Sequence, residues 1–236
     1  MTSILQLEID ELYRFAKYSM LILDYRFFMR TFILLSLLGG GLLSVGGLSA
    51  YQFLAPQAYS EEDFAKGLVA FEAKNHEGAF EIWHPMAKAG HGRAQINIGQ
   101  MYRTGQGVGK DRTQAQHWLG EAANAGLPRA QFALAETYSK TPVAEDKDPS
   151  QAAQWYKRAA DQGHLGAMFW LAVATFNGQG IEQNYTEAYR LMLIASRHGH
   201  KDAERLLAQV QAKVDIVDRI DAEIAAAKWI PKPENS

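Results

Sequence analysis

Small and bulky apolar residues recur through residues 79–200 with a period of 36 or 37, and polar and turn-forming residues separate them. In one unit Ala94 precedes Ile98 by four residues, and in the same unit Ala115 precedes Trp118 by three. Spacings of three and four place side chains on one face of a helix. Each unit therefore predicts two helices, and a fixed period of this length indicates stacked helical hairpins.

Residues at the expected helix ends support this division. The second helix of three units opens at Asp111, Asp148 and Asn184, each followed three residues later by Gln or Glu. This spacing is typical of a capping box, in which the two side chains satisfy free amide groups at the helix start. The glycines expected to end these helices in a left-handed conformation are Gly126, Gly163 and Gly199.

These residues resemble the Sel-one-like repeat family, a relative of the tetratricopeptide repeat. The motif is Tyr102, Gly105-Gln106-Gly107-Val108, Asp111, Ala115, Trp118, Ala122-Ala123 and Gly126, and it returns from Gly178-Gln179-Gly180-Ile181 to Gly199. The unit at residues 128–164 departs from this motif in the turn between its two helices, where residues 141–148 replace the glycine loop. The resemblance implies a right-handed superhelix that acts as a protein-binding scaffold without catalysis.

The predicted fold is all-α, a right-handed α-solenoid of stacked helix-turn-helix repeats, preceded by one hydrophobic transmembrane or signal helix. The expected segments are a leader (1–31), the hydrophobic helix (32–54), a linker (55–60), a degenerate first repeat (61–91), repeats at 92–127, 128–164 and 165–200, C-terminal capping helices (201–230) and a tail (231–236).

The segment from Phe32 to Leu54 has 23 residues without one charged side chain. That length is sufficient to cross a bilayer. Arg26 and Arg30 precede the segment and an acidic run begins at Glu61, so the amino end is predicted to remain in the cytoplasm. The repeats would then lie in the periplasm, anchored to a bacterial inner membrane by a single pass.

Cleavage of this segment remains an alternative. Thirty-one residues precede the segment, which is long for the leader of a signal peptide. A chain that starts at Met29 would instead have the proportions of a signal peptide, with cleavage after Ala50 or Ala58. In that case the true start lies downstream of residue 1, and the mature protein is soluble in the periplasm.

Composition narrows the possible functions. The formal net charge is −2 over 236 residues, and no basic cluster is present that would indicate nucleic-acid binding. The chain has no cysteine, which excludes disulfides and thiol chemistry.

Two motifs invite a chemical interpretation. The stretch Thr104–Asp111 is similar to a phosphate loop, but it follows a helix where a phosphate loop follows a strand, so we interpret it as a glycine turn with positive φ. His91, His164 and His200 each follow a terminal glycine. Equivalent positions in adjacent repeats lie about 10 Å apart, whereas zinc ligands lie about 2 Å from the metal. We expect no metal, cofactor or catalytic residue.

Exposed positions on the first helix of each unit differ between repeats. The resemblance implies that first-helix residues line a concave groove, and the expected partner-binding residues are Asn97, Gln100, Met101, Ala133, Glu136, Thr137, Trp170 and Val173. The last full unit is apolar nearly all round, which predicts a cover. One possible cover is the chain's own carboxyl segment, where apolar residues recur at heptad-like spacing at Leu207, Val210, Val214, Val217 and Ile224. The other is a partner protein or a second copy.

The leading functional hypothesis is a non-enzymatic adaptor of the bacterial cell envelope that binds a partner protein in this groove. The alternative is a cell-wall-associated hydrolase or a component of a polysaccharide or motility assembly. The resemblance implies that enzymatic members of the family are rich in cysteine, and this chain has no cysteine. A structural homo-oligomer is a third possibility.

Overall fold

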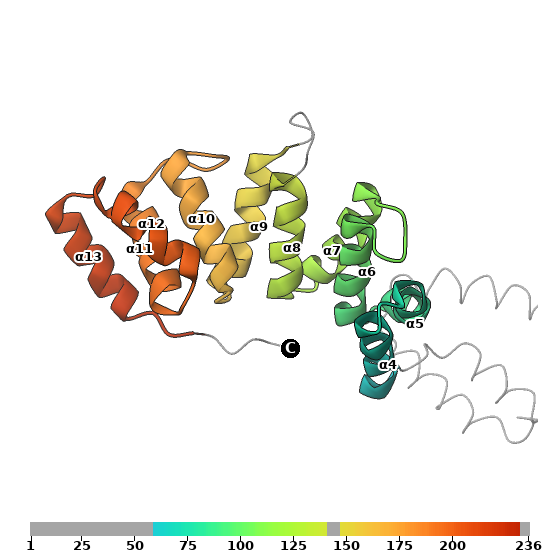
Figure 1. Cartoon of the computed structure of the whole chain (residues 1–236). Coiled ribbons are helices and arrows are strands. Elements are labelled where there is room, and N and C mark those ends of the chain that lie inside the picture. The colour runs from blue at the N-terminus through green and yellow to red at the C-terminus, as the bar shows by residue number, and fades with distance from the viewer. Residues whose placement is uncertain (1–58, 141–146, 232–236) are drawn as a thin grey trace, which may run out of the picture. The chain divides into compact units, whose positions relative to one another are not determined.

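The computed structural model describes residues 59–140 and 147–231 (Figure 1). The expected leader, the apolar segment 32–54 and most of the linker lie outside these residues, as does much of the turn of the third unit. Within the described ranges, no helix combines the length and apolar character that a membrane crossing requires.

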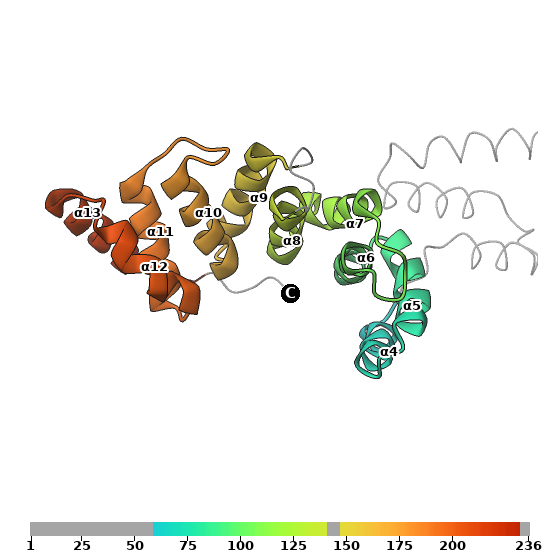
Figure 2. The ribbon, with the colours of Figure 1, turned by 45° about the horizontal axis from the view of Figure 1, so that its top comes forward.

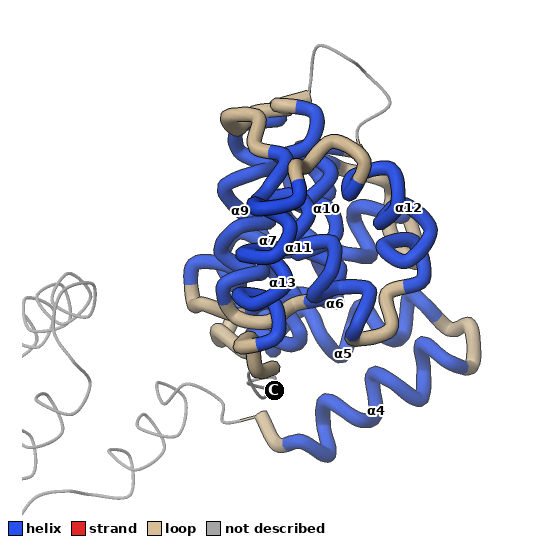
Figure 3. Tube along the Cα trace, turned by 90° about the vertical axis from the view of Figure 1, so that its left-hand side faces the viewer, coloured by secondary structure: helices blue, strands red, loops and turns tan. Residues whose placement is uncertain are grey.

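All regular structure in the described ranges is α-helical (Figure 3). The helices are α4 (Glu61–Glu72), α5 (His76–Lys88), α6 (Gly92–Thr104), α7 (Arg112–Asn124), α8 (Pro128–Ser139), α9 (Pro149–Asp161), α10 (Leu165–Asn177), α11 (Tyr185–Arg197), α12 (Lys201–Gln211) and α13 (Ile216–Ala227). The all-helical prediction is confirmed for this part of the chain. The handedness of the superhelix stays a prediction.

Each helix from α4 to α11 packs against the next one in sequence, and α13 packs on α11 (Figures 1 and 2). Alanines at equivalent repeat positions make this possible, because a small side chain lets two helix backbones approach closely. All are at most 4% exposed: Ala94, Ala130, Ala167 and Ala203 on first helices, and Ala79, Ala115, Ala152 and Ala188 on second helices. The buried side chains form three clusters along the stack, as expected when each repeat packs only on its neighbours.

The predicted acceptors cap the second helices, but the capping box is only half formed. The side chain of Asp111 accepts a hydrogen bond from the Gln114 backbone N–H at 3.0 Å. The Asp111 backbone N–H donates to the Tyr102 carbonyl at 3.0 Å, and not to the Gln114 side chain as a complete capping box requires. Equivalent backbone bonds join Asp148 to Tyr138 and Asn184 to Thr175. The start of each second helix is therefore tied to the end of the first.

Glycine conformations match the sequence prediction. Gly126, Gly163 and Gly199 have φ values of 91°, 98° and 89°, the left-handed conformation expected after the second helices. Gly105 and Gly107 in the following turn have φ values of 78° and 73°, which confirms that this stretch is a structural turn. Only glycine adopts such values without a steric cost.

The chain's own C-terminal segment packs on the last full repeat, which was one of the two predicted possibilities. The residues that it buries, however, are not all the predicted ones. Val210 and Val214 are buried, whereas Val217 is 65% exposed and Ile224 is 49% exposed. The heptad-like prediction is therefore wrong for these last two residues. Helix α12 ends at Gln211 and α13 begins anew after its N-cap Asp215, and this break resets the helical phase.

Helix α13 instead buries Ala222 and Ala226. Two hydrogen bonds join it to α11. The Tyr189 hydroxyl donates to Glu223 at 2.9 Å, and the Thr186 hydroxyl donates to Asp218 at 3.0 Å. Four aliphatic side chains remain exposed on α13, and we call them the α13 outer stripe: Ile216, Val217, Ile220 and Ile224.

Candidate functional site

The structure places the expected partner-binding residues on α6, α8 and α10, but at different depths. Five are partly exposed: Asn97, Gln100, Glu136, Trp170 and Val173. Three are buried in the core: Met101, Ala133 and Thr137. Their assignment to a binding surface stays a prediction. The side chains that reach the surface here are the five of the first group, together with two basic residues described next.

Two basic side chains belong to the same surface and were not predicted. Arg103 lies three residues after Gln100 on α6, and Lys140 follows α8 four residues after Glu136. The i+3 and i+4 spacing, which brings helical side chains together, was the signal that could have found them. We call the combined set the first-helix face: Asn97, Gln100, Arg103, Glu136, Lys140, Trp170 and Val173.

Glu136 is the electrostatic centre of the first-helix face. Lys140 Nζ donates to Glu136 Oε1, and Arg103 Nη1 lies 3.5 Å from Glu136 Oε2. The Arg103 Nε group also donates to Gln100 Oε1 at 2.7 Å. Arg103 comes from one repeat and Glu136 from the next, so this ion pair joins α6 to α8.

The connection continues to α10. Lys140 Nζ lies 4.5 Å from the centroid of the Trp170 ring, a cation–π distance. The Trp170 ring in turn meets Phe169 edge to face, with centroids 5.1 Å apart. Polar and aromatic contacts therefore run from α6 through α8 to α10, and they hold Arg103, Glu136, Lys140 and Trp170 against one another.

A buried tyrosine lies beneath this network. Tyr156 of α9 shares a hydrogen bond of 2.8 Å with Ser139 at the end of α8. The pKa of Tyr156 is raised to about 12, chiefly by burial, while the hydrogen bond with Ser139 opposes this shift; the nearby charges of Glu136 and Arg103 act in opposite directions. Tyr156 is therefore neutral at ordinary pH and serves as a support rather than as a base.

The boundary histidines have structural roles that the sequence did not reveal. His91, His164 and His200 are the N-caps of α6, α10 and α12, and the Nδ1 atom of each accepts a backbone N–H three residues later. Each ring stacks on a phenylalanine from the first helix of the repeat that the histidine ends, at centroid distances of 5.2, 4.5 and 4.4 Å. The glycine before each histidine was the available signal, because it ends one helix and makes the next residue a cap. The described residues contain no cluster of three side chains suited to a metal.

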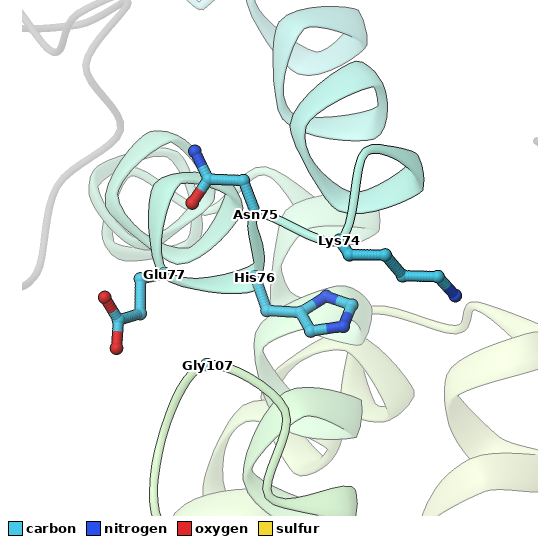
Figure 4. Close-up of a pocket in the computed structure, with 5 residues that line it drawn as sticks. All are labelled: Lys74, Asn75, His76, Glu77 and Gly107. Carbon is cyan, nitrogen blue, oxygen red and sulfur yellow. The ribbon is translucent and has the colours of Figure 1, made fainter.

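A small open pocket of about 260 Å³ lies where the α4–α5 connection meets the glycine turn of the next repeat (Figure 4). Lys74, Asn75, His76, Glu77 and Gly107 line it. The Asn75 side chain caps α5 by accepting the Gly78 N–H at 3.0 Å, so the helix start is already satisfied. We regard this pocket as a packing feature of the turn.

Comparison with protein-family models matches the Sel1 repeat at residues 92–127, 128–164 and 166–200. Among solved structures, the chain is similar to a Sel1 repeat protein from Oxalobacter formigenes, with 28% identity, a TM-score of 0.57, and coverage of 70% of this chain and 68% of that one. It also matches a protective antigen of uropathogenic Escherichia coli strains described as displaying an SLR fold, with 23% identity, a TM-score of 0.44, and coverage of 73% and 45%.

One curated relative is chitin synthase regulatory factor 3 from Schizosaccharomyces pombe, which is 31% identical over 111 residues. The match covers 42% of this chain and 12% of the relative. The chain thus spans only a small part of that protein.

Proposed function

Because residues 92–200 consist of three Sel1 repeats, we propose that this protein is a non-enzymatic adaptor whose first-helix face binds another protein. Sel1 repeat proteins generally mediate protein–protein interaction. The observation that carries the proposal is the inter-repeat network itself. It holds Trp170 and its basic neighbours in position at the surface, and immobilised aromatic and basic side chains contribute most of the energy of many protein interfaces.

The ionisable groups of the face support binding rather than catalysis. Glu136 is paired with two cations, and Tyr156 is neutral at ordinary pH, so neither group is available as a general base. The relative from Schizosaccharomyces pombe is named as a regulatory factor of an enzyme, which agrees with an adaptor role. The alternative of a wall-associated hydrolase, or of a polysaccharide or motility component, stays a prediction.

We further propose that the repeats lie outside the cytoplasm of a bacterium, held at the inner membrane by the apolar segment 32–54. The support is the sequence, which has 23 uncharged residues with arginines before them. Added protease should digest the repeats in intact spheroplasts that carry the full chain. Protection until the membrane is lysed would place the repeats in the cytoplasm, and a digestible but freely released protein would indicate cleavage.

The binding proposal is tested by affinity capture of the full chain from its native envelope, with wild-type protein compared with Trp170→Ala and Val173→Ala. Lys157→Ala is the matched control, because Lys157 is an exposed residue of α9 whose ion pair with Asp161 stays within its own helix. A genuine partner should be retained by wild type and by the control and lost from the two face variants, while the helical circular dichroism of all four proteins stays the same. A partner retained equally by all four would place binding elsewhere.

Self-association is a second candidate, and the α13 outer stripe favours it. Ile220, at the centre of the stripe, is 51% exposed. The outer face of a terminal repeat is ordinarily polar, because nothing packs on it. Sedimentation of the purified full chain should then show a dimer that Ile220→Asp dissociates. A wild-type monomer at micromolar concentration would exclude this candidate.

A further inference from the structure

We propose that the first-helix face recognises a carboxylate of its partner, so that the bound segment is acidic, with an apolar residue beside the acid. Arg103 and Lys140 would bind the carboxylate, and Trp170 with Val173 would contact the apolar residue. This inference rests on the proposed function, since it specifies the chemistry of the partner at the same face.

The charge of the network is unbalanced. Arg103 and Lys140 share the single carboxylate of Glu136, which leaves one positive charge without a counterpart in the cluster. The Glu136 side chain is only 12% exposed, whereas those of Arg103 and Lys140 are 34% and 42% exposed. The accessible part of the network is therefore cationic, and the acid that would neutralise it lies underneath.

The other charges of the first helices do not restore the balance. From α6 to α10, first helices and the cap residue Lys140 carry one acidic side chain, Glu136, and four basic ones: Arg93, Arg103, Arg129 and Lys140. Arg93 is already paired with Glu61 of α4 at 2.7 Å, and α10 has no charged residue. This excess of positive charge occurs in a chain with a net charge of −2, so it is a local feature of these first helices.

The contact geometry leaves capacity for a second acid. The Arg103 Nη1 group lies 3.5 Å from Glu136, which is longer than the 2.7–2.9 Å typical of a charge-assisted hydrogen bond. Arginine presents several N–H groups in one plane and binds a carboxylate through two of them. The Nε bond to Gln100 fixes the plane of the Arg103 guanidinium, so a partner carboxylate would meet a positioned donor set.

The aromatic end of the face explains why the acid should have an apolar neighbour. Trp170 and Val173 are three residues apart on α10 and share one side of that helix. Lys140 lies against the Trp170 ring, so the cationic and apolar parts of the face adjoin each other. A peptide that places an acid beside a bulky apolar residue would satisfy both at once.

Selection of a displayed random-peptide library on the purified full chain tests the inference. Peptides retained by the wild type should be enriched in Asp and Glu next to an apolar residue. The double variant Arg103→Gln with Lys140→Gln should lose the acidic enrichment. The matched control is Arg158→Gln, because the Arg158 guanidinium also lies over a tryptophan, Trp155, at 4.3 Å, but on a second helix. That variant should select the same peptides as the wild type.

Affinity measurements on one selected peptide complete the test. Arg103→Gln should weaken binding about tenfold, the size expected when one charged hydrogen-bond partner is removed. Replacing the acid of the peptide by its amide should weaken binding to the wild-type protein by the same factor. The same replacement should weaken binding to the Arg103→Gln protein much less, because that protein already lacks the arginine. Peptides that bind through Trp170 without any acid would overturn the carboxylate inference and leave the proposed function standing. Binding that is indifferent to Trp170→Ala would instead contradict the proposed function itself.

Discussion

Gly180 lies so close to the backbone of Pro149 that a Cβ atom on the glycine would come within 2.1 Å of the Pro149 carbonyl carbon. The same relationship holds two units earlier, where a Cβ on Gly107 would come within 2.6 Å of the His76 carbonyl. In both cases the turn inside one repeat rests on the start of the second helix of the preceding repeat. The Ser150 hydroxyl adds a hydrogen bond of 3.3 Å to the Gly180 carbonyl.

Gly180→Ala should therefore destabilise the stack by about 2 to 4 kcal/mol, because a Cβ conflicts both with the positive φ and with the neighbouring backbone. Gly120→Ala is the matched control, since a Cβ on this helical glycine meets nothing within 4 Å. The control should gain about 0.5 to 1 kcal/mol from reduced backbone freedom. Urea denaturation followed by circular dichroism measures both, and equal stabilities would contradict the interlocking role.

The histidine caps give a second prediction. His200 accepts the Ala203 N–H at 3.3 Å through Nδ1, and its ring stacks on Phe169. His200→Ala should cost about 1 to 2 kcal/mol, since it removes both the cap and the stacked ring. His200→Asn keeps a side-chain acceptor and should recover about half of that loss. Denaturation curves for the three proteins measure the order, and an Asn variant no more stable than the Ala variant would show that the cap contributes little.

The register of α13 can be tested by one change on each of its faces. Ala226 is 5% exposed and packs in the core that α13 shares with α11, so Ala226→Leu should cost about 1 to 3 kcal/mol through overpacking. Ile220→Ser on the α13 outer stripe should change the stability of the monomer by less than about 0.5 kcal/mol. Thermal denaturation at low protein concentration distinguishes the two, and a reversed order would mean that α13 packs through its isoleucines.

The carboxyl group of Asp63, which takes part in the N-terminal cap of α4, should titrate at an unusually low pH. The pKa of Asp63 is lowered from 3.8 to about 2, chiefly by the hydrogen bond from the Ser60 hydroxyl and next by the one from Lys66. A lowered folded-state pKa means that this capping contribution is fully present above pH 3.8 and is lost as the pH falls toward 2. NMR titration of the Asp63 carboxyl should show this low midpoint, Ser60→Ala should raise it, and Lys66→Gln should raise it less. An unchanged midpoint in Ser60→Ala would contradict the capping box.

Much of the fold could be predicted because its signals are local. The alanines and aromatic residues that recur every 36 or 37 residues, the acceptors at Asp111, Asp148 and Asn184, and the closing glycines all act within one or two helical turns. The resemblance to the Sel-one-like repeats rested on these same residues and is confirmed by the three matched repeats. The degenerate N-terminal hairpin of α4 and α5 was recognised from the same kind of spacing.

The errors arose where contacts between distant elements decide the outcome. The heptad-like spacing grouped Val217 and Ile224 with Val210 and Val214, but the chain turns after Gln211, and the alanine face of α13 meets α11 in place of Val217 and Ile224. The capping boxes predicted for the second helices at Asp111, Asp148 and Asn184 are incomplete because the first helix of the same unit supplies a carbonyl for each cap amide. In both places a contact with another helix decided what a rule based on a few neighbouring residues could not.

The sequence by itself determined that the described chain forms paired helices, where they begin and end, and that they repeat as a Sel1 array, because hydrogen bonding and sterics over a few residues set these features. Only the tertiary structure decided which side chains of the first helices meet. The ion pair of Arg103 with Glu136 joins one repeat to the next, and the position of Lys140 over Trp170 depends on the rotation between repeats. That rotation comes from the packing of whole helices, and no spacing along the chain encodes it.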